Sequence, residues 1–138
     1  MEDRVLETFL QLVKIESESF HEGAAVDFVC KTAKRCGFDY HVDDAGKAIG
    51  GEAGNVYVKM PATGVDAPPV IFSSHLDTVS PGKGVEPVVS RERIVSRGET
   101  ILGADCKAGV AVAIELMYLS REGKLLSLIH ISAPTRPY

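Results

Sequence analysis

The 138-residue sequence lacks features that several large classes of protein require. Basic residues do not predominate, because 15 Lys and Arg stand against 19 Asp and Glu with the two signs intermixed. Such a chain offers no basic surface for a phosphate backbone, so nucleic acid is not an expected partner. Long apolar runs are also missing, since none approaches the roughly 18 residues of a membrane-spanning helix. We therefore expect no membrane partner.

Cysteine is scarce, and the first residues do not resemble a signal peptide. Cys30, Cys36 and Cys106 are odd in number, and their spacing matches neither a zinc knuckle nor a redox pair. We interpret them as small, partly buried hydrophobic side chains. The chain starts with acidic residues, and polar side chains interrupt the apolar ones that follow. Free thiols and the missing signal favour a cytoplasmic location.

Apolar residues at three- and four-residue spacing predict three helices. The first covers residues 2–14, and the second runs from about Glu22 to Arg35 or Cys36, with Gly37 as its C-terminal stop. The third, residues 107–121, is apolar on more than one face, so we expect it to be largely buried against a sheet.

Short β-favouring runs predict strands between the second and third helices. They cover residues 38–42, 55–60, 69–74, 85–90 and 93–96. The first half of residues 69–74 is apolar on both faces, which predicts a central strand of a covered sheet. Residues 55–60 alternate between apolar and polar side chains and are expected nearer an edge. The order of elements predicts an α/β fold, a layered mixed sheet with flanking helices.

Two short acidic motifs have the residue types of a catalytic or metal site. Side chains two apart in an extended chain share a face, so the Asp77 carboxylate can meet one ring nitrogen of His75 and orient it as a metal ligand. A satisfied polar pair is the alternative. Asp105 lies between glycines at the start of the third helix, either as a metal ligand or as a helix cap. The spacing alone leaves these alternatives open.

Three stretches occur in the order and spacing of one enzyme family. Gly54-Asn55 precedes a predicted strand, residues 73–87 read SSHLDTVSPGKGVEP, and residues 101–119 read ILGADCKAGVAVAIELMYL. Together they resemble the opening third of the tripeptidase T-like metallopeptidases. That group belongs to a wider two-zinc family with aminoacylases, glutamate carboxypeptidases and succinyl-diaminopimelate desuccinylases. The resemblance implies that residues 1–123 form the N-terminal part of a zinc-exopeptidase catalytic domain.

The resemblance also implies a role for each motif residue. His75 would be a ligand of one zinc ion, Asp77 the catalytic-site carboxylate that orients it, and Asp105 the carboxylate that bridges two zinc ions. Cys106 stands where many relatives have a second Asp. The peptide bond between Asp105 and Cys106 is implied to be cis.

The implied function is that of a cytoplasmic zinc aminopeptidase, which hydrolyses the N-terminal peptide bond of short peptides with a metal-activated water. One alternative is an N-acyl-amino-acid amidohydrolase of the same family. The other is a non-catalytic binding module or an inactive truncated product. In the family, a Glu-Glu pair supplies the general base and a metal ligand, and a late histidine is another ligand. The pair is missing here, because Glu115 and Glu122 stand singly, and His130 comes too early to be the late histidine. We expect at most weak zinc binding and no peptidase activity from this chain. A homodimer would form through a missing lid domain.

Residues 124–138 are interpreted as a non-native tail. Their Ser-Leu-Ile-His-Ile-Ser-x-Pro-Thr-Arg resembles the in-frame translation of a common sequencing adapter, with Ala133 in place of the usual Glu. A genuine apolar strand that stops at proline is the alternative. A fragment of this kind exposes apolar faces and a sheet edge, so we expect poor solubility. A monodisperse monomer that melts cooperatively would contradict this.

Overall fold

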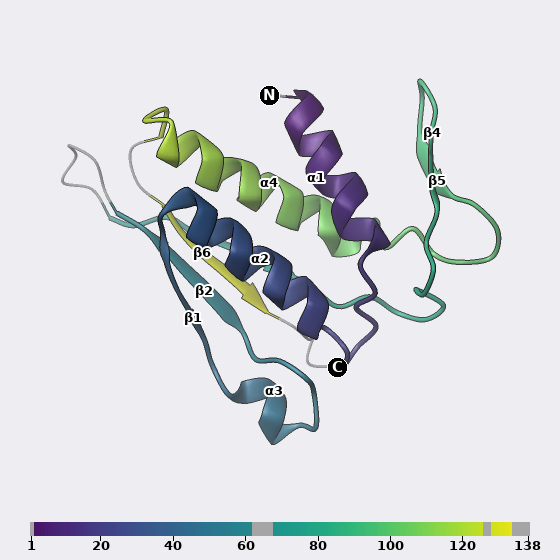
Figure 1. The fold of residues 1–138 in the computed structure, drawn as a ribbon, viewed down its shortest axis with the longest axis horizontal. Coiled ribbons are helices and arrows are strands. Elements are labelled where there is room, and N and C mark those ends of the chain that lie inside the picture. The colour runs from purple at the N-terminus through teal and green to yellow at the C-terminus, as the bar shows by residue number, and fades with distance from the viewer. Residues whose placement is uncertain (1, 62–67, 126–127, 134–138) are drawn as a thin grey trace.

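The computed structural model describes residues 2–61, 68–125 and 128–133, which form a mixed α/β fold (Figure 1). Its helices are α1 (Glu2–Lys14), α2 (Gly23–Cys36), α3 (Ala45–Ala48) and α4 (Ala104–Arg121). Its strands are β1 (Asp39–Val42), β2 (Val56–Met60), β3 (Ile71–His75), β4 (Pro87–Val89), β5 (Ile94–Ser96) and β6 (Leu128–Ala133). The three long helices and five of the strands lie where the sequence predicts them.

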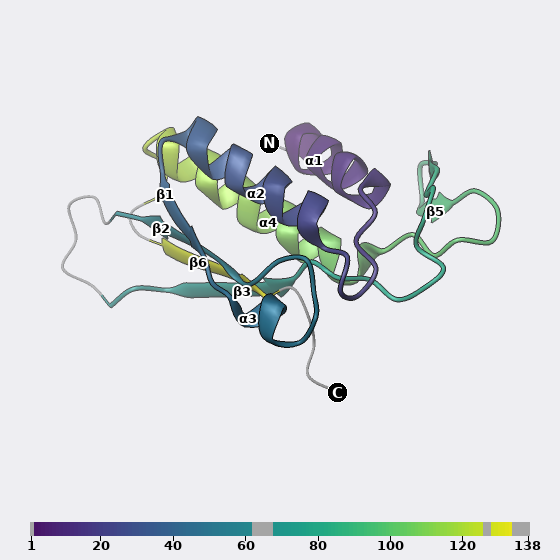
Figure 2. The same ribbon diagram turned by 60° about the horizontal axis from the view of Figure 1, so that its bottom comes forward.

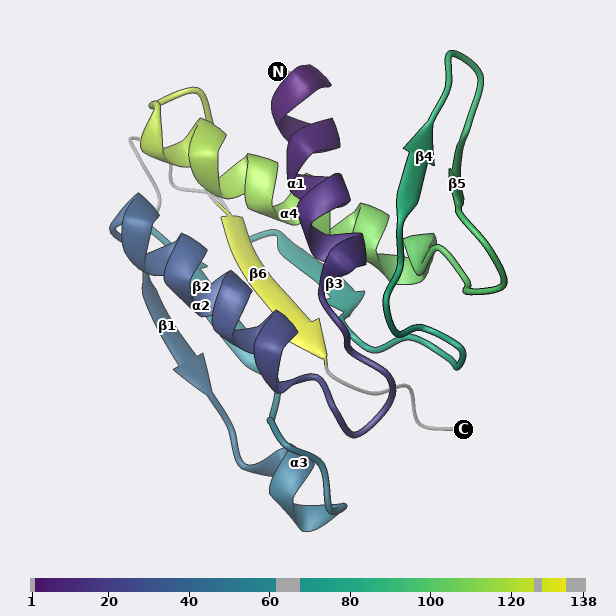
Figure 3. The same cartoon turned by 45° about the vertical axis from the view of Figure 1, so that its right-hand side comes forward.

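The main sheet has the strand order β1-β2-β6-β3. Strands β1 and β2 are antiparallel, as are β2 and β6, whereas β3 and β6 are parallel, so the predicted mixed sheet is confirmed. Strands β4 and β5 form a separate antiparallel pair, which extends beside α1 in Figure 3. None of the described helices is long and apolar enough to cross a membrane.

The predicted positions of β2 and β3 are wrong for the described sheet. Strand β3 lies at its edge, and Val70, Ile71 and Phe72 are 52%, 60% and 39% exposed. Strand β2 lies inside, paired on both sides. The reason is that α1, α2 and α4 all cover the same face of the sheet (Figure 2). The alternation of apolar and polar residues in β2 therefore reflects a sheet with one covered face, not an edge position. On the other face of the sheet, the apolar residues of β3 are left uncovered.

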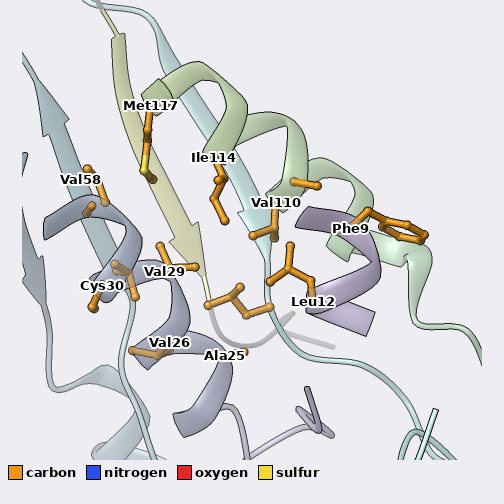
Figure 4. Packing of buried hydrophobic residues seen from close by; sticks show 14 of the residues in the cluster. Phe9, Leu12, Ala25, Val26, Val29, Cys30, Val58, Val110, Ile114 and Met117 are labelled. Carbon is orange, nitrogen blue, oxygen red and sulfur yellow. The ribbon is translucent and has the colours of Figure 1, made fainter. Parts of the chain in front are cut away.

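The core lies between this helical layer and the sheet (Figure 4). Because α4 packs against α1, α2 and β3, its apolar residues contact both layers, as the sequence predicts for the third helix. Lys107 and Glu115 are the buried charged residues of this helix. The fully buried apolar side chains include Leu12, Val13, Ala25, Val29, Val56, Val58, Val110, Ile114 and Met117.

The suspected tail contributes backbone to the sheet. Residues 128–133 pair with β2 and β3, which agrees with a strand in the first half of the tail. Residues 126–127 and 134–138 lie outside the described residues, and the pairing does not test where the tail comes from. Its non-native origin stays a prediction.

Candidate metal centre

Two segments that are far apart in the sequence meet at the carboxyl end of β3. His75 is the last residue of that strand, and Asp77 follows it. Asp105 and Cys106, in the first turn of α4, have non-helical backbone angles, so the regular helix starts at Lys107, as the sequence predicts. The Asp105–Cys106 peptide bond is cis, which confirms the expectation from the resemblance.

The contacts of the His75 ring favour one tautomer. Its Nδ1 lies 3.0 Å from the backbone oxygen of Asp77 and 3.1 Å from Oδ1 of the same residue. A backbone carbonyl can only accept, so Nδ1 carries the hydrogen and donates it. The neutral ring then presents the lone pair of Nε2. A carboxylate behind the ring in this way is the usual support of a metal-binding histidine.

The Nε2 atom of His75 faces Asp105 Oδ1 at 3.2 Å. Both atoms carry lone pairs when the ring is neutral and the carboxyl ionised, so a proton or a cation must lie between them to make the approach favourable. Two ligands of one tetrahedral zinc ion, each about 2.0 Å from the metal, are about 3.3 Å apart. The observed spacing and the nitrogen and oxygen donors therefore fit zinc.

Asp77 is itself held in place. The residue is buried, and its Oδ2 accepts a hydrogen bond of 2.8 Å from the Ser19 hydroxyl. The chain around Ser19 runs beside the segment after β3, where Thr78 N donates to Ser17 O at 2.8 Å and Ser19 N donates to Thr78 O at 3.1 Å. Sequence reasoning missed Ser19, because its polar neighbours indicated only the end of the first helix.

A buried lysine ties this region to α1. Lys107 is 1% exposed, and its Nζ donates a hydrogen bond of 2.6 Å to the backbone oxygen of Ile15. Burial lowers the pKa of this amine to about 8, because the low-dielectric interior disfavours its charge. The contact fixes the first regular turn of α4 against the end of α1, next to Asp105.

The metal-site candidates border an open cavity of about 470 Å³. The His75 side chain is 15% exposed and that of Asp105 is 73% exposed, so the ring is held by the fold while the carboxylate faces solvent. Apolar atoms predominate in the walls. The lining residues are His75, Asp77, Thr78, Val79, Ile101, Leu102, Gly103, Ala104 and Asp105.

The structure brings together His75, Asp77 and Asp105, the three residues that the sequence singles out, and leaves the two later glutamates elsewhere. Glu115 accepts hydrogen bonds of 2.6 and 2.7 Å from Arg4, and Glu122 accepts one of 2.6 Å. Both serve the packing of α1 on α4, so neither replaces the missing general base.

Comparisons with known proteins show what the whole chain is similar to. No family model matches the chain. The sequence is 42% identical over 125 residues to the uncharacterized protein YqjE of Bacillus subtilis, a match that covers 88% of this chain and 32% of that protein.

Two crystal structures resemble 96% of this chain at 34% sequence identity. A tripeptidase from Staphylococcus aureus superimposes with a TM-score of 0.88, and aminopeptidase PepT from Bacillus cereus with a TM-score of 0.89. The match covers 36% of each of those chains, so this chain spans about a third of the length of its relatives. In sequence and in structure, the chain is thus similar to one third of a peptidase T-like metallopeptidase.

Proposed function

We propose that this chain carries one part of the metal centre of a zinc aminopeptidase that acts on short peptides. The observation that carries the proposal is the approach of His75 Nε2 to Asp105 Oδ1 at 3.2 Å, with Nδ1 of the ring committed to Asp77. The similarity to a tripeptidase and to an aminopeptidase supports this reaction class.

The residues of the chain have separate tasks in this proposal. Zinc, when bound, polarises the scissile carbonyl and lowers the pKa of a bound water. His75 would be a ligand of one zinc ion, and the Asp105 carboxylate would be a ligand shared by two. Asp77 keeps Nδ1 protonated and orients the ring, and Ser19 orients Asp77. The apolar cavity walls, which include Ile101 and Leu102, offer apolar contacts to the side chains of a small peptide.

Hydrolysis also needs a base, and the described part of the cavity does not contain one. Apart from Asp77 and Asp105, no carboxyl lines it within residues 2–61, 68–125 and 128–133. We propose that the Glu-Glu pair, the remaining ligands and a lid domain that forms a homodimer belong to a longer cytoplasmic protein, because the relatives are about three times as long. The 138-residue chain alone should not turn over substrate.

The first test is to sequence the source DNA across codon 119 and beyond. The protein encoded by the longer reading frame is then assayed, with zinc, on a tripeptide and on an N-acetyl amino acid. We expect the reading frame to continue into a strand and Glu-Glu, and the product to hydrolyse the tripeptide. Asp105→Ala should abolish that activity. Hydrolysis of the N-acetyl amino acid alone would replace the proposal with an amidohydrolase. A frame that stops at Tyr138, or a zinc-loaded product that cleaves neither substrate, would contradict catalysis.

A further inference from the structure

The thiol of Cys106 lies at the candidate metal centre, and the proposed function does not use it. One ligand atom from each of His75, Asp105 and Cys106 lies within 4.8 Å of the other two. Cys106 is half-buried, whereas Cys30 and Cys36 are buried in the core, where burial raises the pKa of both thiols. Of the three cysteines, Cys106 is therefore the one placed to react with a metal.

The surrounding backbone leaves room for this thiol. A Cβ atom on Gly109 would lie 2.7 Å from Cys106 Sγ and 2.9 Å from the hydroxyl oxygen of Ser74, closer than real Cβ atoms approach. Any other residue at this position would therefore displace the Cys106 sulfur or the Ser74 hydroxyl. The Ser74 hydroxyl also donates to the backbone oxygen of Cys106 at 3.2 Å, which ties Cys106 to the residue before His75.

The three donors form a set with a definite metal preference. Thiolate sulfur binds zinc at about 2.3 Å and is a poor ligand for magnesium, calcium or manganese, which prefer oxygen. Ligands of one tetrahedral zinc ion lie about 3.3–3.8 Å apart. The observed separations are within 4.8 Å, so a shift of about an ångström in the exposed Asp105 or the half-buried Cys106 brings all three onto one ion.

We infer that the Cys106 thiolate is a ligand of the metal held by His75 and Asp105. The inference rests on the proposed metal centre and adds to it a sulfur donor that an aspartate at this position would not supply. The consequence is a centre that favours zinc over harder cations and releases metal when its thiol is oxidised or alkylated.

The test is a spectroscopic titration of the reduced chain with Co²⁺, which can stand in for zinc. A thiolate ligand gives a sulfur-to-cobalt charge-transfer band in the near ultraviolet, separate from the visible ligand-field bands that any bound Co²⁺ gives. We expect both sets of bands in the parent chain. Cys106→Ser and Cys106→Asp should lose the charge-transfer band and keep visible bands, and Cys36→Ala should keep both.

Alkylation with iodoacetamide, followed site by site by mass spectrometry, gives an independent result. Without metal, Cys106 should react much faster than the buried Cys30 and Cys36, and zinc should slow its reaction about tenfold or more. Visible Co²⁺ bands without a charge-transfer band, together with no protection by zinc, would overturn ligation by Cys106 and leave the metal centre standing. No bands at all would overturn the metal centre of the proposed function as well.

Discussion

Replacing Gly54 with alanine should lower the free energy of unfolding by at least about 4 kcal/mol. A Cβ atom on Gly54 would overlap the backbone oxygen and the carboxylate of Asp43. That carboxylate is fully used, since it accepts from the backbone and side-chain amides of Asn55 at 2.7 and 2.8 Å and from the Tyr57 hydroxyl at 3.1 Å. These hydrogen bonds, that of the Asn55 side chain first, lower the pKa of Asp43 to about 2.

The substitution therefore separates β1 from the start of β2. Urea unfolding at low protein concentration measures the loss, and Gly23→Ala is the matched control. An added Cβ at Gly23 meets only the flexible Glu52 side chain at 3.0 Å, so that variant should change stability by less than about 1 kcal/mol. If Gly54→Ala does not fold, Asp43→Asn should still show a smaller loss of about 1–2 kcal/mol. Parent-like stability of both variants would contradict the packing of this turn.

Replacing Arg4 with methionine should destabilise the chain by about 2 kcal/mol, less than the loss of a fully buried pair because the Arg4 side chain is 34% exposed. Arg4 forms a two-bond pair with Glu115, whose side chain is 6% exposed, and its guanidinium also stacks 4.7 Å from the centre of the Tyr118 ring. Its bond to Glu122 lowers the pKa of that carboxyl to about 2. Without Arg4, the Glu115 carboxylate would stay buried without its cation.

A double-mutant cycle separates the pair from simple packing. Arg4→Met combined with Glu115→Met should recover most of the loss, because a buried pair replaced by apolar side chains is often neutral. Lys31→Met is the control, since its ion pair with Asp27 is exposed and should contribute less than about 1 kcal/mol. A single-mutant loss as small as that control would show that the pair does not hold α1 on α4.

Local patterns in the sequence predict the helices and strands, because each depends on residues close to one another in the chain. The apolar spacing of residues 2–14 gives α1 its predicted bounds, and Gly37 ends α2 in the left-handed conformation expected of a C-terminal stop. Helix α3 was not predicted, because four residues within a glycine-rich connection carry no periodic signal. The central position predicted for β3 and the position nearer an edge predicted for β2 are wrong, because which face of a strand is covered depends on distant segments.

In the candidate site, too, only residues within short motifs can be predicted from the sequence. His75, Asp77 and Asp105 are recognisable from short motifs, and the structure brings them together. Ser19 is not recognisable in this way, nor is the Arg4–Glu115 pair outside the site, because these contacts join residues that lie 58 and 111 positions apart in the sequence. Their contribution depends on how α1 and the segment after it pack, which no local pattern records.

Zinc binding by this chain decides whether His75 and Asp105 form a metal centre. Equilibrium titration should show weak but site-specific zinc binding by the reduced parent chain. The affinity of His75→Ala and of Asp105→Ala should be lower by about tenfold or more. His41→Ala removes an exposed histidine on β1 and should bind as the parent does. Equal zinc binding by the parent, His75→Ala and Asp105→Ala would show that these residues do not form a metal centre.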